Sequence, residues 1–442
     1  MAVLPQGRLF SWKEIENIGD LARLQLVLET LPDEALMRAL ETHRGKGRDD
    51  YPIRAVWNSI LAGIVFEHKS VESLRRELLR NDRLRWLCGF DPLKPAEQAV
   101  PGSYVYSRLL TLLLKQTRQI DEMFDALVTA LQQVLPDFGL QLAMDGKAIE
   151  THAKSRDGLG EMKPDGRRDV DADFGKKTYK GVRDDGTPWK KVVSWFGYKL
   201  HLLVDAQYEL PVGYLVTKAS ANEIPQAKVL LEKVNQKHPK LLEATENYLG
   251  DRGLDDGELI RKLWDDHGIK PVIDIRNCWK DGEETKLVQG QSNVVYNYKG
   301  QVYCYCPRTG EQRKMAYGGF EQDRQTLKYR CPAIHYGLQC AGCNVCPVGK
   351  AIRISLNEDR RVFTPIARDS YKWDSLYKKR TAVERVNSRL DVSFGFENHF
   401  IRGLEKMQLR VGLALVVMLA MALGRIKHKQ KENLRSLVKA VA

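Results

Sequence analysis

The stretch FGLQLAMD, residues 138–145, alternates apolar and polar side chains and ends in an aspartate. This period of two predicts a strand with one face in a hydrophobic core. Four later runs are also rich in β-forming residues: FGYKLHLLVD at 196–205, LPVGYLVT at 210–217, NYLGD at 247–251 and KPVIDI at 270–275. The first strand and the run at 247–251 therefore both end in an acid.

Helical stretches separate the later strands. Asn222–Val234 and Asp255–Trp264 have apolar residues at helical spacing, and the second opens with two acids suited to a helix N-terminus. The order of elements predicts an α/β fold with an antiparallel three-strand meander, followed by two parallel strands with crossover helices. This is the ribonuclease-H-like architecture. Thr151–Ser194 is charged and glycine-rich, and we interpret it as a long excursion between the first two strands.

Other regions surround this core. We expect a helical N-terminal domain at 1–135, the first part of the core at 136–277, an inserted cysteine-rich β module at 278–365, and a helical completion of the core with a basic tail at 366–442. Ser70 and Ser103 are expected helix N-caps. The helices on either side of residues 68–70 permit a helix-turn-helix that places Arg75 and Arg76 against DNA, but a dimerisation bundle fits equally well.

Composition limits the function classes. The chain has 442 residues, of which 43% are hydrophobic, and a formal charge of +13, so it can bury large cores and favours a polyanionic partner such as nucleic acid. Its longest apolar run, Val411–Leu423, is shorter than the roughly 18 to 20 residues of a membrane span, which predicts a buried helix and no membrane contact. Without a secretory-signal pattern at its start, the chain is expected in the cytoplasm with reduced thiols.

Three carboxylates are candidate catalytic and metal-binding residues. Asp145 and Asp251 each close a strand, and Glu384 lies in the late helical segment YKKRTAVERVNSRL. Three acids carry about −3, which suits two hard divalent cations with open positions for phosphate and water. Two such ions support phosphoryl transfer. Each acid alone also has a structural explanation, as a strand-ending turn residue or, for Glu384, as a helical partner of Arg380.

Other polar residues near these positions have structural explanations. Turn, cap or strand positions account for four further acids, Asp205, Asp255, Asp256 and Asp274. Lys199 and His201 alternate with apolar residues on a strand, and we expect their face to meet solvent.

Several blocks of this sequence resemble a known family. AMDGKAIET, WFGYKLHLLVDAQYELPVGYLVTKASANE, YLGDRGLDD and YKKRTAVERVNSRL look like successive blocks of bacterial insertion-sequence transposases of the D-D-E class, and residues 51–90 resemble the helical domain before their catalytic core. In that family the third acid lies in the pattern Tyr, two residues, Arg, three residues, Glu, six residues, Lys or Arg. Tyr377, Arg380 and Glu384 fill the first three places, but Asp391 stands in the last, so we expect a weakened or rearranged DNA contact.

The resemblance implies a function. It describes a DNA transposase that binds the terminal inverted repeats of its element, cleaves phosphodiester bonds with two Mg²⁺ or Mn²⁺ ions, and joins 3′-hydroxyl ends to target DNA. It assigns DNA contacts to Tyr377 and Arg380, on one helix face with Glu384. It implies double-stranded DNA as partner, a homodimer, and a bacterial cytoplasmic location on the nucleoid when DNA is bound.

The cysteines raise a separate metal hypothesis. Six of the eight lie close together in the sequence: Cys304, Cys306, Cys331, Cys340, Cys343 and Cys346. Cysteines two residues apart in CAGCNVC, with a second group from a facing hairpin, predict a tetrahedral structural zinc site. The sequence does not separate the four ligands from the other two, and a set of reduced structural thiols is the alternative.

Two other functions share these features: a non-catalytic DNA-binding regulator derived from such an enzyme, and a ribonuclease-H-like nuclease. The complete set of three acids favours a catalyst over a regulator, because clustered carboxylates repel phosphate when no metal is present. The resemblance, more than the spacing, favours transposition over other nuclease chemistry.

Overall fold

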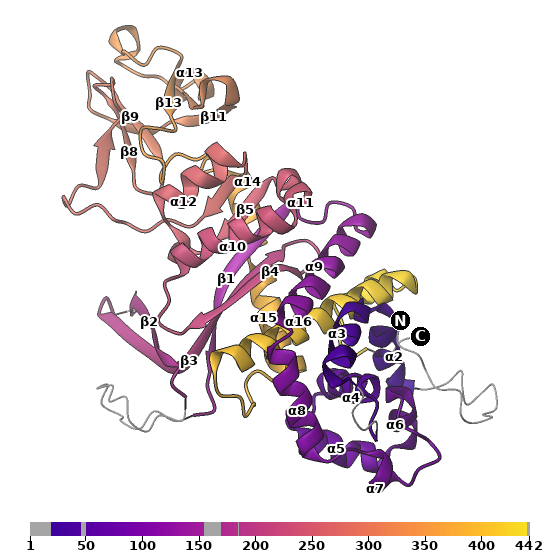
Figure 1. Ribbon diagram of the computed structural model, residues 1–442. Helices are drawn as coiled ribbons and strands as arrows, with labels where there is room; N and C mark the ends of the chain where they lie inside the picture. Colours follow the sequence, from indigo (N-terminus) through magenta and orange to yellow (C-terminus); the bar gives the residue numbers. More distant parts are fainter. Residues whose placement is uncertain (1–18, 46–49, 154–168, 184, 440–442) are drawn as a thin grey trace.

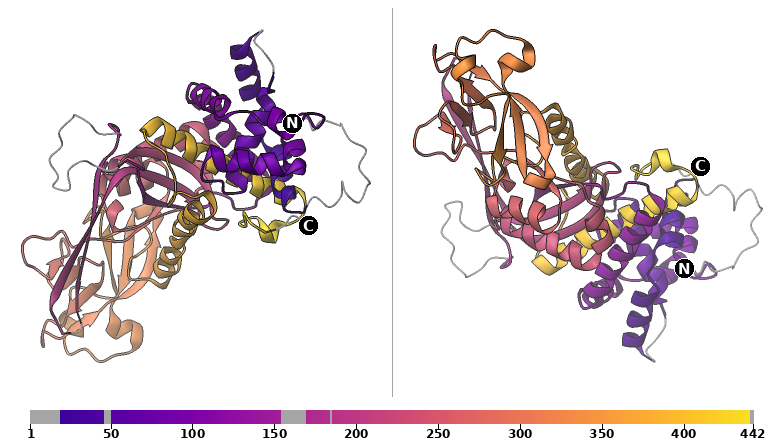
Figure 2. Two further views of the ribbon diagram at one scale, coloured as in Figure 1. Left: turned by 90° about the horizontal axis from the view of Figure 1, so that it is seen from below. Right: turned by 90° about the horizontal axis from the view of Figure 1, so that it is seen from above.

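The computed structural model describes residues 19–45, 50–153, 169–183 and 185–439. A helical region lies at one end, a mixed sheet with flanking helices in the middle, and a small β module at the other end (Figures 1 and 2). The predicted α/β class with N-terminal helices is confirmed, and the central sheet is consistent with a ribonuclease-H-like core.

The helical region is built from short amphipathic helices. They are α2 (Ala22–Thr30), α3 (Glu34–Arg44), α4 (Ile53–Val65), α5 (Val71–Arg80), α6 (Asp82–Cys88), α7 (Ala96–Ala99), α8 (Ser103–Leu114) and α9 (Thr117–Val134). Ser70 caps α5 as predicted, because its hydroxyl accepts the Ser73 N–H. The prediction for Ser103 is wrong: Ser103 is the first residue of α8, and Gly102 holds the cap position.

The long apolar helix α16 (Leu404–Lys427) joins the helical region to the sheet, packing against α2, α9 and β4. Of the described helices, it is the one long and apolar enough to cross a membrane, but 89% of its most apolar window is buried inside the protein. Because neighbouring elements bury α16 on more than one side, the helix carries apolar residues around its whole circumference. The prediction of a buried helix is confirmed.

The central sheet has six strands: β1 (Gln141–Glu150), β2 (Asp173–Val182), β3 (Pro188–Asp205), β4 (Leu210–Lys218), β5 (Asn247–Gly250) and β6 (Lys270–Ile273). Their order is β2-β3-β1-β5-β6, with β4 pairing the second half of β3. β1 is antiparallel to β3 and parallel to β5, and β5 is parallel to β6. The predicted meander and parallel pair are therefore present.

The interpretation of Thr151–Ser194 as an excursion is wrong in its second half. Residues 173–182 form β2, which pairs with residues 188–197 of β3 in a two-stranded ribbon. The tryptophan rings of Trp195 and Trp189 pack where a Cβ on Gly175 or Gly181 would lie, so the glycines that suggested a loop accommodate cross-strand rings. Residues 154–168 of the predicted excursion lie outside the described residues.

Helices cover both faces of the sheet. They are α10 (Glu223–Lys237), α11 (Pro239–Ala244) and α12 (Gly257–Arg261), which continues into a π-helical turn at Lys262–Asp266, with α14 (Tyr371–Lys378) and α15 (Thr381–Phe394) later in the chain. Gly146 faces Glu223 of α10, whereas the next residue, Lys147, reaches Asp391 of α15. Successive strand residues point to opposite faces, so α10 and α15 lie on opposite sides of β1.

The predicted helical segment YKKRTAVERVNSRL, residues 377–390, is not one continuous helix. The chain breaks between α14 and α15, where Lys379 and Arg380 donate backbone N–H groups to Leu376 and Tyr377 in tight three-residue turns. Short 3₁₀ turns occur elsewhere, at Gly19–Leu21, Arg252–Leu254, Gln322–Arg324, Cys343–Val345 and Lys431–Asn433.

Between β6 and α14 the chain forms two small antiparallel sheets. One contains β7 (Thr285–Leu287), β8 (Val294–Asn297), β9 (Val302–Tyr305) and β10 (Gln312–Lys314). The other contains β11 (Ala316–Glu321), β12 (Thr326–Arg330) and β13 (Ala351–Ser355), and α13 (Pro332–Tyr336) lies in the connection between β12 and β13. This β module has a hydrophobic cluster of its own, separate from the main core.

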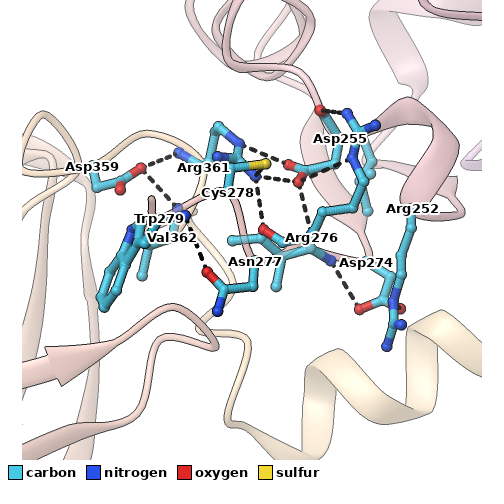
Figure 3. A network of polar contacts seen from close by, with 12 residues as sticks. Arg252, Asp255, Asp274, Arg276, Asn277, Cys278, Trp279, Asp359, Arg361 and Val362 are labelled. Carbon is cyan, nitrogen blue, oxygen red and sulfur yellow. Dashed lines mark hydrogen bonds and ion pairs between the residues drawn. The ribbon is translucent and has the colours of Figure 1, made fainter. Parts of the chain in front are cut away.

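The β module is tied to the sheet by a buried ion pair. Asp255, which precedes α12, has a fully buried side chain that accepts the Arg276 backbone N–H at 2.8 Å and pairs with the Arg361 guanidinium. Arg361 also donates to the carbonyl oxygen of Arg276 at 3.0 Å, so the segments leaving and re-entering the core are joined at one point (Figure 3). The structural role predicted for Asp255 agrees with these contacts.

We predict that Asp255→Ala lowers the free energy of unfolding by about 2–3 kcal/mol, because it leaves the Arg361 and Arg276 groups without their shared acceptor. Urea denaturation measures the effect. Asp265→Ala is the matched control, since it removes an exposed partner of Arg360 at 3.0 Å and is expected to cost less than about 1 kcal/mol. Equal losses for the two variants would contradict the role of Asp255.

Candidate active site

The register of two parallel strands brings the first two predicted acids together. β1 and β5 pair Gln141 with Asn247, Leu142 with Tyr248 and Ala143 with Leu249. Continuing this register by two residues aligns Asp145 with Asp251. Neighbouring strands lie about 4.8 Å apart, so the two residues lie side by side. The prediction that Asp145 closes its strand is wrong, because β1 continues to Glu150, whereas Asp251 directly follows β5 as predicted.

The Asp145 carboxylate lies in a strongly perturbed environment. Burial raises its pKa to about 6, and repulsion from Asp251 and Glu223 adds to this rise, against the opposing effects of Lys177 and the Gly146 N–H. Asp251 accepts the Gly253 N–H at 2.8 Å. A partly buried acid with a raised pKa and acidic neighbours is more typical of a functional site than of a turn.

Glu384 is connected to this pair through an arginine. It lies in the first turn of α15 with a half-exposed side chain, and its carboxylate pairs with Arg380 at 2.8 Å. The Arg380 guanidinium also interacts electrostatically with Asp145. In the described part of the chain, no three His, Cys, Asp or Glu side chains are grouped to hold one ion. Arg380 is thus the direct partner of Glu384 and also interacts with Asp145.

The prediction that Tyr377 and Arg380 share one helix with Glu384 is wrong, because the helix is interrupted between α14 and α15. Tyr377 is the second-last residue of α14, and Arg380 is the N-cap residue of α15. Tyr377 stacks on Trp373 with ring centroids 4.8 Å apart, and the Arg380 guanidinium lies 5.6 Å from the Tyr377 ring centroid. The aromatic pair therefore supports the guanidinium where the helix is broken.

The structure does not bring Arg75 and Arg76 to the acids. Both lie on α5, in the helical region away from β5 (Figure 1). Arg75 pairs with Glu72 at 2.8 Å and donates to the Pro101 carbonyl, whereas Arg76 is exposed.

Asp391, the departure from the family pattern, has a cationic partner on the first strand. Its carboxylate pairs with the Lys147 ammonium at 2.5 Å, and both side chains are largely buried. Lys147 follows Asp145 by two residues and points to the same face of β1. Arg385 and Arg389 do not replace the missing cation, because both contact Glu209. The positive charge opposite position 391 therefore comes from β1.

A groove of 1640 Å³ begins at this ion pair. Its lining mixes charges of both signs with aromatic rings: three lysines (Lys69, Lys147, Lys176), four acids (Glu150, Asp173, Asp391, Glu397), two histidines (His152, His399), and the rings of Phe174, Trp195, Phe196, Phe396 and Phe400. The rings suit stacking on unpaired bases, whereas the acids outnumber the lysines.

The six clustered cysteines line one small cavity in the β module, far from the acids (Figure 1). All eight cysteines are free thiols. The Thr309 hydroxyl and nearby backbone N–H groups lower the pKa of Cys306 to about 6, whereas burial raises that of Cys304 to about 11. The structure gathers the predicted thiols around one space without placing three of them in a ligating group among the described residues.

The other acids have structural roles, as expected. Asp205 accepts backbone N–H groups from Gly139, Gln207 and Tyr208, Asp256 caps α12, and Asp274 pairs with Arg252. The expectation for Lys199 and His201 is wrong, because both side chains are buried. Their strand lies in the middle of a sheet covered on both faces, which period-two alternation alone does not reveal.

Sequence reasoning missed two charged residues at the acids. Lys177 lies on β2, within the supposed excursion, and donates to the Gly146 carbonyl at 3.3 Å. Glu223 follows the N-cap residue Asn222, where an acid is usual for a helix start. The one sequence signal that sets Glu223 apart from other helix-start acids is its place as the last residue of the block WFGYKLHLLVDAQYELPVGYLVTKASANE, which resembles the transposases.

A mixed sheet with two aspartates on neighbouring strands is consistent with the class of proteins that have a ribonuclease-H-like core. Comparison with known families then gives the assignment. Residues 137–420 match the family described as Transposase DDE domain, so the chain belongs to this family, whose activity is DNA transposition with divalent metal ions.

Other comparisons add little. No curated protein matches the sequence. Among solved structures, a piggyBac transposase synaptic complex with hairpin DNA, determined by cryo-electron microscopy, is similar over 97% of this chain and 81% of that chain, with a TM-score of 0.37 and 11% identity. The family assignment rests on the sequence match alone.

We predict that exchanging the charges of Lys147 and Asp391 restores the protein stability that either charge reversal alone removes. Lys147→Asp and Asp391→Lys each place like charges together in a largely buried pair and should destabilise the protein by about 2 kcal/mol. The double variant should recover at least half of the combined loss in a denaturation cycle. Strict additivity of the two losses would show that the residues do not interact.

Proposed function

We propose that this chain is a transposase of the bacterial insertion-sequence type that binds the terminal inverted repeats of its element, cleaves phosphodiester bonds and joins the 3′-hydroxyl ends to target DNA. The alignment of Asp145 with Asp251 by the β1–β5 register, in a chain of this family, supports the proposal most strongly.

The residues at the strand edge fit Mg²⁺ or Mn²⁺. Asp145 and Asp251 offer hard oxygen donors. Asp251 and Glu223 repel the partly buried Asp145 carboxylate, against the attraction of Lys177. The Glu223 carboxylate occupies the space that glycines 146 and 253 leave beside the strands. When bound by Asp145, Asp251 and Glu384, two such ions supply the charge that stabilises phosphoryl transfer.

Arg380 and Tyr377 would position the DNA. The Arg380 Nε atom is buried without a hydrogen-bond partner in the described structure, and its Nη2 holds Glu384. A phosphate would satisfy this guanidinium better than a half-exposed carboxylate does, because it accepts two parallel N–H bonds. Exchange of Glu384 for phosphate would free the third acid to join Asp145 and Asp251. Hydrolysis would leave a 3′-hydroxyl that attacks the target strand.

The DNA would follow the groove and the β2–β3 ribbon, which projects beyond the sheet (Figure 1). Lys176 lines the groove, and Arg183, Lys190 and Lys191 are exposed further along the ribbon. Trp189 is 37% exposed among them. Exposed cations along a projecting two-stranded ribbon suit contacts to the phosphate backbone.

For the β module we propose a structural Zn²⁺ held by four of the six clustered cysteines. The shared cavity and the lowered pKa of Cys306 support it, since zinc binds thiolates. The ligands would have to close around the ion. Zinc there would stabilise the module and take no part in the chemistry.

A non-catalytic DNA-binding regulator is the second candidate. One observation favours it: Glu384 is paired with Arg380, and no three acids in the described residues form a common centre. A ribonuclease-H-like nuclease would keep the acids but cut unrelated duplexes or RNA.

We predict that the purified chain nicks DNA carrying its element ends only with Mg²⁺ or Mn²⁺. Asp145→Asn, Asp251→Asn and Glu384→Gln should each lower the nicking rate at least about 10³-fold, because each removes charge from the metal site. Binding of the same DNA should change less than about threefold.

Asp374→Asn is the control, because this acid is exposed on α14, and it should nick at the rate of the unmodified chain. Nicking that survives loss of two of the three acids would reject the site. Metal-dependent cutting of RNA or unrelated duplexes at the same rate would favour the nuclease.

We predict that Lys190→Glu with Lys191→Glu lowers duplex affinity at least about tenfold and reduces the slope of log K against log salt by about one to two. Filter binding over a salt series measures both. Lys427→Glu with Lys429→Glu makes the same change of charge at exposed positions, one at the end of α16 and one just after it. An equal loss in this control would mean that net charge, and not the ribbon, sets the affinity.

A further inference from the structure

A second pocket lies between the helical region and the start of α16. It has a volume of 660 Å³, which is within the range of about 300–1,000 Å³ that is usual for small-molecule sites. Its walls come from α4, α5, α8 and the loop between α4 and α5 on one side, and from residues 394–413 on the other. The described residues that line it include neither the paired aspartates nor any residue of the β2–β3 ribbon.

The apolar part of this wall is mainly aliphatic. It includes Ile60, Ile64, Leu74, Leu110, Leu409 and Leu413. Such a wall favours an apolar ligand, because each methylene group removed from water contributes about 0.8 kcal/mol. Unpaired nucleobases bind by stacking on aromatic rings, and here aliphatic side chains outnumber aromatic ones. A hydrocarbon chain therefore fits this pocket better than a base.

Three cations in the wall have no acidic partner. Arg402, Lys406 and Arg410 recur every four residues at the start of α16, and all three line the pocket. None of them forms an ion pair with another described residue. Glu67 is the one acid among the described residues that line the pocket. The wall therefore carries an excess of positive charge beside its aliphatic surface.

Two of these cations are partly buried, which makes their lack of a counter-ion costly. Burial lowers the pKa of Arg410 to about 10, with no offsetting acid among the described residues. The Arg410 guanidinium donates to the Phe394 carbonyl oxygen at 2.8 Å. Arg402 Nε and His68 Nε2 are both buried without a hydrogen-bond partner in the described structure. An anion bound here would satisfy groups that the fold leaves unpaired.

We propose that this pocket binds a small amphipathic anion, with a carboxylate or similar headgroup on Arg402, Lys406 and Arg410 and a hydrocarbon chain between α4, α8 and α16. The inference does not depend on the proposed function. An unpaired nucleotide from DNA in the neighbouring groove is the competing occupant, because Lys69 and Phe400 line both spaces.

The test is titration calorimetry of the full chain with sodium octanoate, without DNA or metal. Octanoate should bind at least about tenfold more tightly than 1-octanol, which lacks the charge, and than butanoate, which lacks half of the chain. It should also raise the melting temperature, because it binds the folded state. Absence of octanoate binding, or equal affinity for octanol, would overturn the proposal.

Arg402→Gln with Lys406→Gln tests the headgroup. This double variant should weaken octanoate binding at least about tenfold and leave octanol binding unchanged. Lys427→Gln with Lys429→Gln is the control, since it makes the same change of charge at exposed positions near the other end of α16. An equal loss of octanoate affinity in the control would mean that net charge alone attracts the anion.

Ser107→Trp tests the place of the hydrocarbon chain. Ser107 lines the pocket from an exposed position on α8, and its hydroxyl bonds only within that helix, to the Ser103 carbonyl oxygen at 3.1 Å. The indole should fill the pocket and abolish octanoate binding, while the melting temperature without ligand stays within a few degrees. Octanoate binding that survives this change would place the ligand elsewhere and reject the pocket.

Thymidine monophosphate is the second probe. Octanoate should bind the unmodified chain more tightly than this nucleotide does, because the wall is mainly aliphatic. Tighter binding of the nucleotide, lost in Ser107→Trp, would assign the pocket to DNA and reject the amphipathic anion.

Discussion

The structure depends on the parallel register between β1 and β5. Hydrogen bonds pair Ala143 with Leu249, and the same register brings Asp145 level with Asp251, although the two residues are distant in the sequence. A slip of one residue would turn either aspartate to the opposite face of the sheet. The buried residues Leu142 and Leu249 oppose such a slip, because their side chains would leave the main core. The packing of the core and the position of the charged site are thus fixed by one constraint.

Charged side chains from several elements surround Asp145 and Asp251. Burial and neighbouring acids raise the pKa of Asp145 to about 6, so the sheet carries concentrated negative charge at one point. Cations approach from separate elements: Lys177 from β2, Lys199 from β3 and Arg380 from the break between α14 and α15. Each has contacts with backbone or with another acid, which leaves the carboxylates only partly compensated. A site of this kind is prepared for divalent cations at its centre and for phosphates at its margin.

The sequence predicted the strands that have clear hydrophobic alternation, and it singled out both aspartates because each follows an apolar run, although β1 continues past Asp145 to Glu150. Predictions from the sequence were wrong or incomplete where a residue's structure depends on a contact with a residue distant in the chain. β2 contains glycines and charges typical of a loop, and pairing with β3 makes it a strand. The partner of Asp391 is a lysine on the first strand, which no helical spacing reveals. Glu223 has the sequence position of an ordinary helix-start acid, and only the fold places its carboxylate beside Gly146 and Gly253. Local patterns gave the elements, whereas the charges of the site come from tertiary packing.

The most direct test of this account is anomalous diffraction from crystals of the full chain grown with Mn²⁺. The account predicts an anomalous peak at the carboxyl edge of β1 and β5, within ligand distance, about 2.1–2.3 Å, of oxygens from both Asp145 and Asp251. Well-ordered carboxylates with no peak between them at saturating Mn²⁺, or a peak held by other residues alone, would contradict it.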